Sequence, residues 1–170
     1  MLIIDPKQAE LSRLPHVVSL RPDGDAHAIL EALALFAESI KKRQSVLNDR
    51  SAETGDAVHW WDAGFHVSVL FLDEYVALRT MFPKRASKED LDYCLATFDG
   101  LVKRIVTMGA SAGCYAIISI AEASVEEGGL PSMVRSACST RILFRPTLPE
   151  ARLIWDADRL ADLAAPRTYG

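Results

Sequence analysis

Cysteine, long apolar runs and a leader sequence are scarce or missing in these 170 residues. The three cysteines, Cys94, Cys114 and Cys138, are widely spaced and form no Cys-x-x-Cys pair, which excludes a disulfide framework and a cysteine-based zinc site. No apolar run approaches the length of a membrane-spanning helix, and the first residues lack the charged and apolar regions of a signal peptide. We therefore expect core thiols and a cytoplasmic location.

An excess of basic charge is missing as well. The chain has 19 Lys and Arg residues against 23 Asp and Glu residues, which gives a formal net charge of −4. Proteins that bind nucleic acid on their own usually carry a basic excess, so we do not expect this chain alone to bind DNA tightly. Its length and its ordinary share of hydrophobic residues, 49%, predict one domain with one core.

The hydrophobic pattern alternates between strand-like and helix-like segments. The strand-like segments are 2–5, 17–20, 65–72, 115–120 and 141–144, and the helix-like segments are 25–47, 87–109, 131–137 and 148–155. Ser87 is the expected N-cap of the second long helix, and a polar surface loop is expected over 48–63. The alternation predicts an α/β fold with a mostly parallel sheet and flanking helices.

Two carboxylates, Asp73 and Glu74, directly follow the segment 65–72, which is apolar on both faces, as a central parallel strand is. Such a strand delivers its last residues to the carboxyl edge of the sheet, where α/β proteins bind ligands. There one acid can hold Mg²⁺ through its water shell while the other polarises the attacking water in nucleotide hydrolysis. The alternative is structural: Asp73 caps the helical turn that follows, and the negative charge of Glu74 interacts favourably with the dipole of that turn.

A phosphate-binding loop does not accompany these acids. None of the nine glycines is followed by lysine, so the motif G-x-x-x-x-G-K-[ST] does not occur. Residues 109–113 match the G-x-S-x-G pattern of serine hydrolases, but that elbow needs a strand before the serine and a histidine after it. Here a helix is expected before Ser111 and all four histidines precede it, so we interpret the glycines as a helix stop and a tight turn.

Other polar groups have simpler interpretations. His59 and His66 lack a cysteine partner and are typical of loop and core residues rather than of a zinc site. The basic residues gather near the carboxyl end of the first long helix, where their positive charges interact favourably with the helix dipole and are solvated: Lys41, Lys42, Arg43 and Arg50. Arg141 and Arg145 border a short apolar strand, and they either form surface salt bridges or reach the phosphates of a neighbouring subunit.

Taken in order, these pieces resemble the motor domain of the FtsK/SpoIIIE family of DNA translocases, including its conjugative-element branch. The matching segments are Ile3-Ile4-Asp5-Pro6-Lys7 with Leu14-Pro15-His16, the helix 25–47, Leu70-Phe71-Leu72-Asp73-Glu74, 109–113 leading into 115–121, and 130–144. The first of these is similar to the strand after the P-loop helix, and 25–47 is similar to the helix that follows it. Leu70-Phe71-Leu72-Asp73-Glu74 is similar to the Walker B strand. Residues 109–121 are similar to the approach to the sensor strand, and 130–144 to the helix and strand that close the core. The resemblance spans about residues 1–156.

The resemblance implies a RecA-like P-loop NTPase core in which Asp73 positions Mg²⁺ through water, Glu74 activates water and Glu122 senses the γ-phosphate of ATP. It implies that Arg141 or Arg145 acts in trans as an arginine finger. The intact protein would bind ATP and Mg²⁺, form a homo-hexameric ring and pull double-stranded DNA through it, in chromosome segregation or in conjugative transfer. This segment would make no direct membrane contact, whereas the intact protein can be anchored through a segment outside it.

The chain departs from the family pattern at three places. The Walker A strand and helix are missing, Ile120-Ala121-Glu122 stands where the family has a Thr-Gln pair, and Tyr169-Gly170 is not followed by the closing hairpin and DNA-guiding appendage. We therefore expect residues 1–165 to be a single partial motor domain, with 166–170 as a tail, whose sheet exposes unpaired edges and an apolar groove. Such a chain should self-associate, bind no nucleotide tightly and be inactive alone. The alternative is a catalytically inert adaptor or regulatory protein that docks onto an active translocase.

Overall fold

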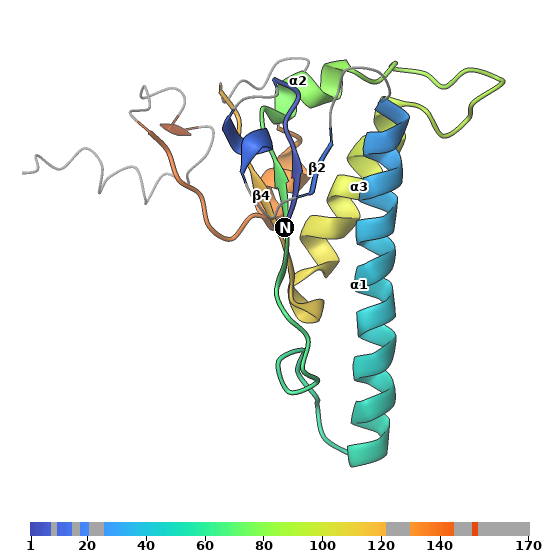
Figure 1. The fold of residues 1–170 in the computed structure, drawn as a ribbon, viewed down its shortest axis with the longest axis vertical. Helices are drawn as coiled ribbons and strands as arrows, with labels where there is room; N and C mark the ends of the chain where they lie inside the picture. Colours follow the sequence, from blue (N-terminus) through green and yellow to red (C-terminus); the bar gives the residue numbers. More distant parts are fainter. Residues whose placement is uncertain (8–9, 15–17, 21–25, 122–129, 145–150, 153–170) are drawn as a thin grey trace, which may run out of the picture.

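The centre of the molecule is one parallel sheet of four strands in the order β2-β1-β3-β4 (Figure 1). This computed structural model describes residues 1–7, 10–14, 18–20, 26–121, 130–144 and 151–152. The strands are β1 (Leu2–Ile4), β2 (Val18–Leu20), β3 (Ser68–Leu72) and β4 (Cys114–Ile118). The α/β class is therefore confirmed, and the strand before Asp73 lies in the interior of the sheet, as its sequence predicts.

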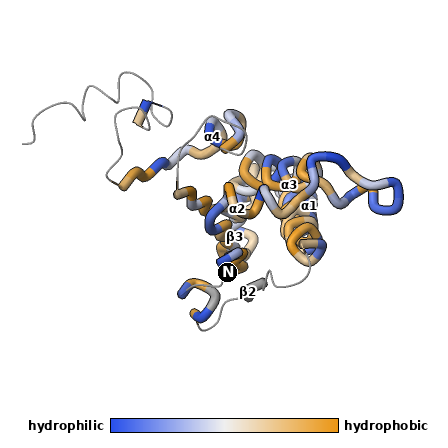
Figure 2. Tube along the Cα trace, turned by 90° about the horizontal axis from the view of Figure 1, so that it is seen from above, coloured by the Kyte–Doolittle hydropathy of each residue, from blue (hydrophilic) through white to orange (hydrophobic). Residues whose placement is uncertain are grey.

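The helices lie mainly on one side of this sheet, where α1 and α3 run side by side (Figures 1 and 2). The helical elements are η1 (Glu10–Arg13), α1 (Ala26–Thr54), α2 (Tyr75–Thr80), α3 (Leu95–Met108), η2 (Ala110–Ala112) and α4 (Ser132–Ala137). α3 lies against β4, and α1 packs along α3. In α1 the buried residues Ile29, Leu33, Ala37 and Ile40 recur every three or four positions, which is the spacing of one helical face. Within the described residues, no helix is both long and apolar enough to cross a membrane.

The two faces of the sheet are buried unequally. Leu70 and Leu72 of β3 are fully buried in the core that α1 and α3 share with the sheet. On the opposite face Phe71 is only half-buried, and Tyr115 and Ile117 of β4 expose 42% and 48% of their surface. The expectation that β3 is buried on both faces is therefore wrong, because α1 and α3 cover the first face, whereas the contacts of η1 with the sheet are mainly with β1 and β2.

The end of α1 also differs from expectation. The helix continues to Thr54, so the first part of the loop expected over 48–63 is helical. The Ser51 hydroxyl donates a hydrogen bond to the carbonyl of Leu47 (2.7 Å) and accepts one from the backbone N–H of Val58 (2.9 Å). Because Leu47 is buried and Ser51 holds the following loop, the last turns have partners that the polar sequence does not reveal.

Two further boundaries are corrected. The helix expected from Ser87 begins instead at Leu95, because the Ser87 hydroxyl accepts the Asp90 N–H (3.0 Å) and the Asp90 carboxylate accepts the Tyr93 N–H (3.1 Å), which closes local turns. The segment 141–144 is not a strand. Of the helix expected over 148–155, only 151–152 is described, and it is helical. The short helix expected over 131–137 is confirmed as α4.

One member of the basic cluster, Arg43, is a structural residue. Its guanidinium donates to the carbonyls of His66 (2.8 Å) and Ala112 (3.1 Å) and to the hydroxyl of Ser68 (2.8 Å). It also lies over the ring of Phe65, 5.1 Å from its centroid. The expectation of a solvated side chain is therefore wrong for Arg43, which ties the middle of α1 to the amino ends of β3 and β4.

The two glycines of the 109–113 motif are required by packing. A Cβ atom on Gly109 would lie 2.3 Å from the carbonyl oxygen of Cys114, and one on Gly113 would lie 2.6 Å from the ring of Trp60. Gly113 also has a φ of +69°, which favours glycine. The motif joins α3 to β4, so helix precedes strand and the order required for a nucleophile elbow is not met.

We predict that Gly109→Ala lowers the free energy of unfolding by about 1–3 kcal/mol, because the new methyl group meets backbone atoms that cannot move away cheaply. Gly100→Ala is the matched control, since a Cβ there meets nothing within 4 Å in the middle of α3. It should raise the stability by about 0.5–1 kcal/mol. Urea unfolding of the three proteins measures both effects, and equal stabilities would contradict the packing explanation.

Candidate functional site

Polar residues follow the last residues of three adjacent strands, at the carboxyl edge of the sheet. Asp5 comes directly after β1, Asp73 and Glu74 come after β3, and Ser119 comes after β4. The Asp73 N–H donates to the carbonyl of Ile4, and the Ser119 N–H donates to the carbonyl of Leu72, both at 2.9 Å. These bonds extend the parallel pairing by one residue, so the three strand ends remain in register where their side chains become polar.

The Ser119 hydroxyl connects the two acids of this edge. It donates a short hydrogen bond to the Asp73 carboxylate and accepts one from the backbone N–H of Glu74 (3.0 Å). The Ser119 carbonyl accepts a third bond, from the backbone N–H of Tyr75 (2.9 Å). The turn after β3 is therefore fixed to the end of β4, and the Asp73 carboxylate has a defined orientation.

Glu74 adopts an unusual backbone conformation. Its φ of 49° and ψ of 54° lie in the left-handed region, and it is the only non-glycine residue with positive φ among those described. That conformation costs an L-residue about 1–2 kcal/mol, and such strain clusters at functional sites. Glu74 occupies the N-cap position of α2 without a side-chain cap bond, and Asp73 bonds Ser119. A helix cap by Asp73 is therefore not supported, whereas Glu74 does lie at the amino end of α2, where a negative charge favours the helix dipole.

Lys7 brings a positive charge to the same edge. Its ammonium group lies 2.6 Å from Oε1 of Glu74, and its backbone N–H donates to the fully buried carboxylate of Asp5 (2.9 Å). The hydrogen bond to Glu74 raises the pKa of Lys7, and the negative charges of Glu74, Asp73 and Asp5 raise it further against an opposing desolvation effect. The lysine therefore partly neutralises the negative charge at this edge, most directly that of Glu74.

The chemistry of this group suits a hard cation and an ordered water. Carboxylate and hydroxyl oxygens are the ligand type that Mg²⁺ prefers, and Mg²⁺ usually keeps several waters and takes only one or two protein carboxylates. Asp73, oriented by Ser119, can supply that one carboxylate. Within the described ranges, no three His, Cys, Asp or Glu side chains converge closely enough to bind a metal directly.

The three remaining expected site residues are Arg141, Glu122 and Arg145, and no hydrogen bond described above joins them to this edge. Arg141 is half-buried, and its Nε donates to the carbonyl of Cys138 in its own chain (3.2 Å). Glu122 and Arg145 lie outside the described residues. The structure therefore places Asp73 and Glu74 together at the carboxyl edge, through their bonds to Ser119, and the sensor and the arginine finger stay predictions.

Three residues of this edge, Asp5, Lys7 and Ser119, are not predicted from the sequence as site residues. Ser119 directly follows the carboxyl end of an apolar strand, and the same position after a strand identifies Asp73. The apolar pattern, however, places Ser119 inside the strand expected over 115–120. Lys7 belongs to the Asp-Pro-Lys sequence after β1, yet its contact with Glu74 joins residues 67 positions apart. A pairing over that distance cannot be read from local sequence.

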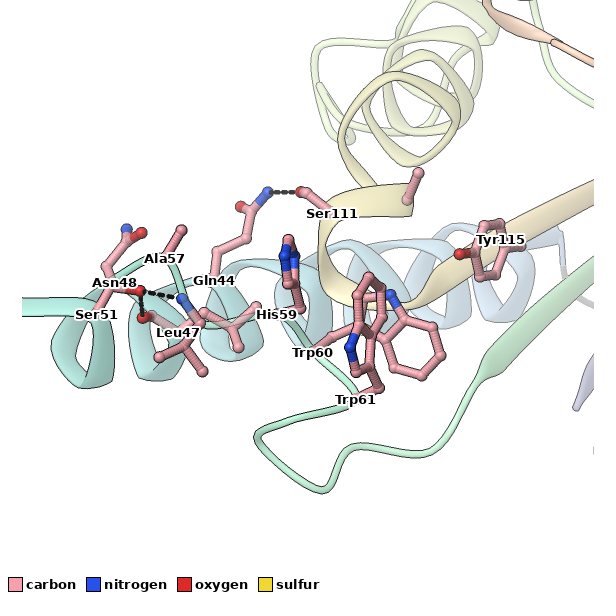
Figure 3. Close-up of a pocket in the computed structure, with 12 residues that line it drawn as sticks. Gln44, Leu47, Asn48, Ser51, Ala57, His59, Trp60, Trp61, Ser111 and Tyr115 are labelled. Atoms are coloured by element: carbon pink, nitrogen blue, oxygen red, sulfur yellow. Dashed lines mark hydrogen bonds between the residues drawn. The ribbon is translucent and has the colours of Figure 1, made fainter. Parts of the chain in front are cut away.

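A cleft lies at the opposite, amino end of the strands (Figure 3). It is a cleft of about 630 Å³ between the end of α1, the loop with Trp60 and Trp61, and Tyr115. His59 stacks on Trp61 with ring centroids 4.4 Å apart, and Gln44 of α1 donates to the Ser111 hydroxyl (3.1 Å). His59 is thus part of an aromatic stack, in agreement with its interpretation as a loop residue.

We predict that Lys7 titrates above its ordinary pKa of 10.5 and that Glu74→Gln lowers this pKa, because the variant removes the hydrogen bond and the nearest negative charge. Any contribution of the pair to stability is present below pH 10.5 and is lost as the pH rises through the raised pKa. An NMR titration of the lysine side chains measures the shift. Glu89→Gln, at an exposed position in the loop before α3, is the control. Identical Lys7 titrations in all three proteins would contradict the pairing.

No known protein-family model matches this chain, and no curated protein matches it.

Proposed function

We propose that this chain is part of an ATP-driven double-stranded DNA translocase with a RecA-like core, as its resemblance to the FtsK/SpoIIIE motor implies. The observation that carries the proposal is the meeting of Asp73, Glu74 and Ser119 at the carboxyl edge of a parallel sheet in which β1, β3 and β4 are neighbours. Ligands of open α/β sheets bind at this edge. The strained backbone of Glu74 gives independent support for a functional role.

The two acids would have different roles. Asp73, fixed by the Ser119 hydroxyl, would hold Mg²⁺ through its water shell, and that ion would neutralise charge on the ATP phosphates. Glu74 would accept a proton from the attacking water through its carboxylate. Only its Oε1 is engaged by Lys7 in the contacts described above, and its side chain is 22% exposed, so water reaches it.

The rest of the proposed machinery depends on a phosphate cradle and on neighbouring subunits outside this sequence, and on three further residues within it. Since no G-x-x-x-x-G-K-[ST] motif occurs here, the phosphate cradle would have to come from elsewhere. Glu122 would sense the γ-phosphate, and Arg141 or Arg145 would act across the subunit boundary of a homo-hexameric ring. The net charge of −4 agrees with a chain that meets DNA only as part of that larger assembly.

A second candidate function is a catalytically inert adaptor or regulator of an active translocase. The observation that favours it is the Lys7–Glu74 ion pair, because an acid held by an ammonium group at 2.6 Å is engaged in structure as well as available for chemistry. In that case Asp73 and Glu74 would be an inherited scaffold, and binding to an intact motor would be the measurable activity.

We expect the 170-residue chain to show negligible ATP turnover with Mg²⁺ and duplex DNA, because it has no phosphate-binding loop. The source DNA should next be read in frame upstream of Met1. If it encodes a strand and G-x-x-x-x-G-K-[ST], the extended protein should hydrolyse ATP in a DNA-dependent way. Glu74→Gln should then lower kcat by about 10²–10⁴-fold while ATP binding remains.

Glu89→Gln is again the control, and its kcat should stay unchanged. A stop codon directly upstream would contradict the translocase proposal and favour the adaptor, for which capture of a purified homologous motor by this chain is the assay. Substantial Mg²⁺-dependent turnover by the 170-residue chain, abolished by Glu74→Gln, would contradict the dependence on an external phosphate cradle.

A further inference from the structure

The outer edge of β4 has no partner strand among the described residues, since β4 is the last strand in the order β2-β1-β3-β4. Gly113 accepts a hydrogen bond from Ser68, and Ser119 donates one to Leu72, so the odd-numbered positions of this segment bond to β3. In a parallel pair, alternate residues direct both backbone groups to opposite sides. The N–H and C=O groups of Ala116 and Ile118 therefore point away from β3, towards the free edge.

Within β4 itself, the residues that normally prevent strand addition do not occur. The sequence of β4, Cys-Tyr-Ala-Ile-Ile, contains no charged residue and no proline. Edge strands usually carry lysine, proline or a bulge, because unpaired backbone groups otherwise recruit another strand. Tyr115 and Ile117 are also 42% and 48% exposed, on the sheet face opposite the core that α1 and α3 share with the sheet. An apolar, uncharged edge is thus combined with an apolar, open face.

The composition of β4 makes it complementary to itself. In an antiparallel pair centred on Ala116, Tyr115 stands opposite Ile117 of the partner subunit, and Cys114 stands opposite Ile118 of the partner subunit. Pairs of an aromatic with a β-branched residue are among the favourable cross-strand pairs, each worth about 0.2–1 kcal/mol. Because the strand is uncharged, two copies meet without like-charge repulsion at the contact, although each chain has a net charge of −4.

We propose that β4 pairs antiparallel with β4 of a second copy of this chain, so that two four-stranded sheets become one continuous sheet across a two-fold axis. The axis is perpendicular to the sheet, which leaves the helical faces of both copies on the same side. The Asp73 edges of the two copies point in opposite directions. Neither copy completes the other's site, so this pairing does not rest on the proposed function.

Sedimentation velocity of the full 170-residue chain over a wide concentration range tests this pairing. We expect a monomer–dimer equilibrium in which Ile117→Lys raises the dimer Kd by at least about tenfold, because it places a charge opposite Tyr115 at both ends of the pair. Leu35→Lys is the matched control, since Leu35 is 71% exposed on α1, away from β4, and its Kd should not change. Tyr115→Lys provides a second edge variant if Ile117→Lys does not fold, as judged by circular dichroism.

Amide hydrogen exchange distinguishes edge pairing from contact through the open face. The amides of Ala116 and Ile118 should exchange more slowly as the concentration rises, and this protection should be lost in Ile117→Lys. The proposal is overturned by a monomer at every concentration, by assemblies larger than a dimer, or by a dimer that folded Ile117→Lys and Tyr115→Lys leave intact. It is also overturned if the amides of Ala116 and Ile118 exchange equally fast in monomer and dimer.

Discussion

The parallel register of β1, β3 and β4 is the constraint on which the candidate site depends. The three strands end at the same level, so the polar residues that follow them lie at one end of the sheet: Asp5, Asp73 and Ser119. If β3 shifted by one position, Asp73 would turn to the other face and lose Ser119. Fully buried Leu70 and Leu72 prevent that shift, because it would move them out of the core.

The edge combines strain with several local restraints. The left-handed backbone of Glu74 is retained because Ser119 binds the turn twice, through its hydroxyl to the Glu74 N–H and through its carbonyl to the Tyr75 N–H. Lys7 then compensates part of the negative charge that the register concentrates. Ser119 and Lys7, which follow the two strands beside β3, thus hold Asp73 and Glu74 in an arrangement that a carboxylate pair would not adopt by itself.

Local sequence predicted the parts of the structure that local physics controls. The four described strands and the glycine turn 109–113 follow from apolar runs and from backbone freedom, and Asp73 with Glu74 follows from its place after a buried strand. The late start of α3 was missed because hydrogen bonds of Ser87 and Asp90 compete with helix formation. Contacts over long separations, such as Ser119 with Asp73, were missed because no periodic pattern records them.

The three bonds of Arg43 have a mechanical consequence. α1 is a rod of about 43 Å, and its far end extends past the sheet in Figure 1. Arg43 clamps this rod to Ser68, to His66 and to Ala112 at one point, where rotating the helix would break all three bonds together. A displacement of α1 would therefore be passed at this point to the amino ends of β3 and β4, the strands whose other ends carry Asp73 and Ser119.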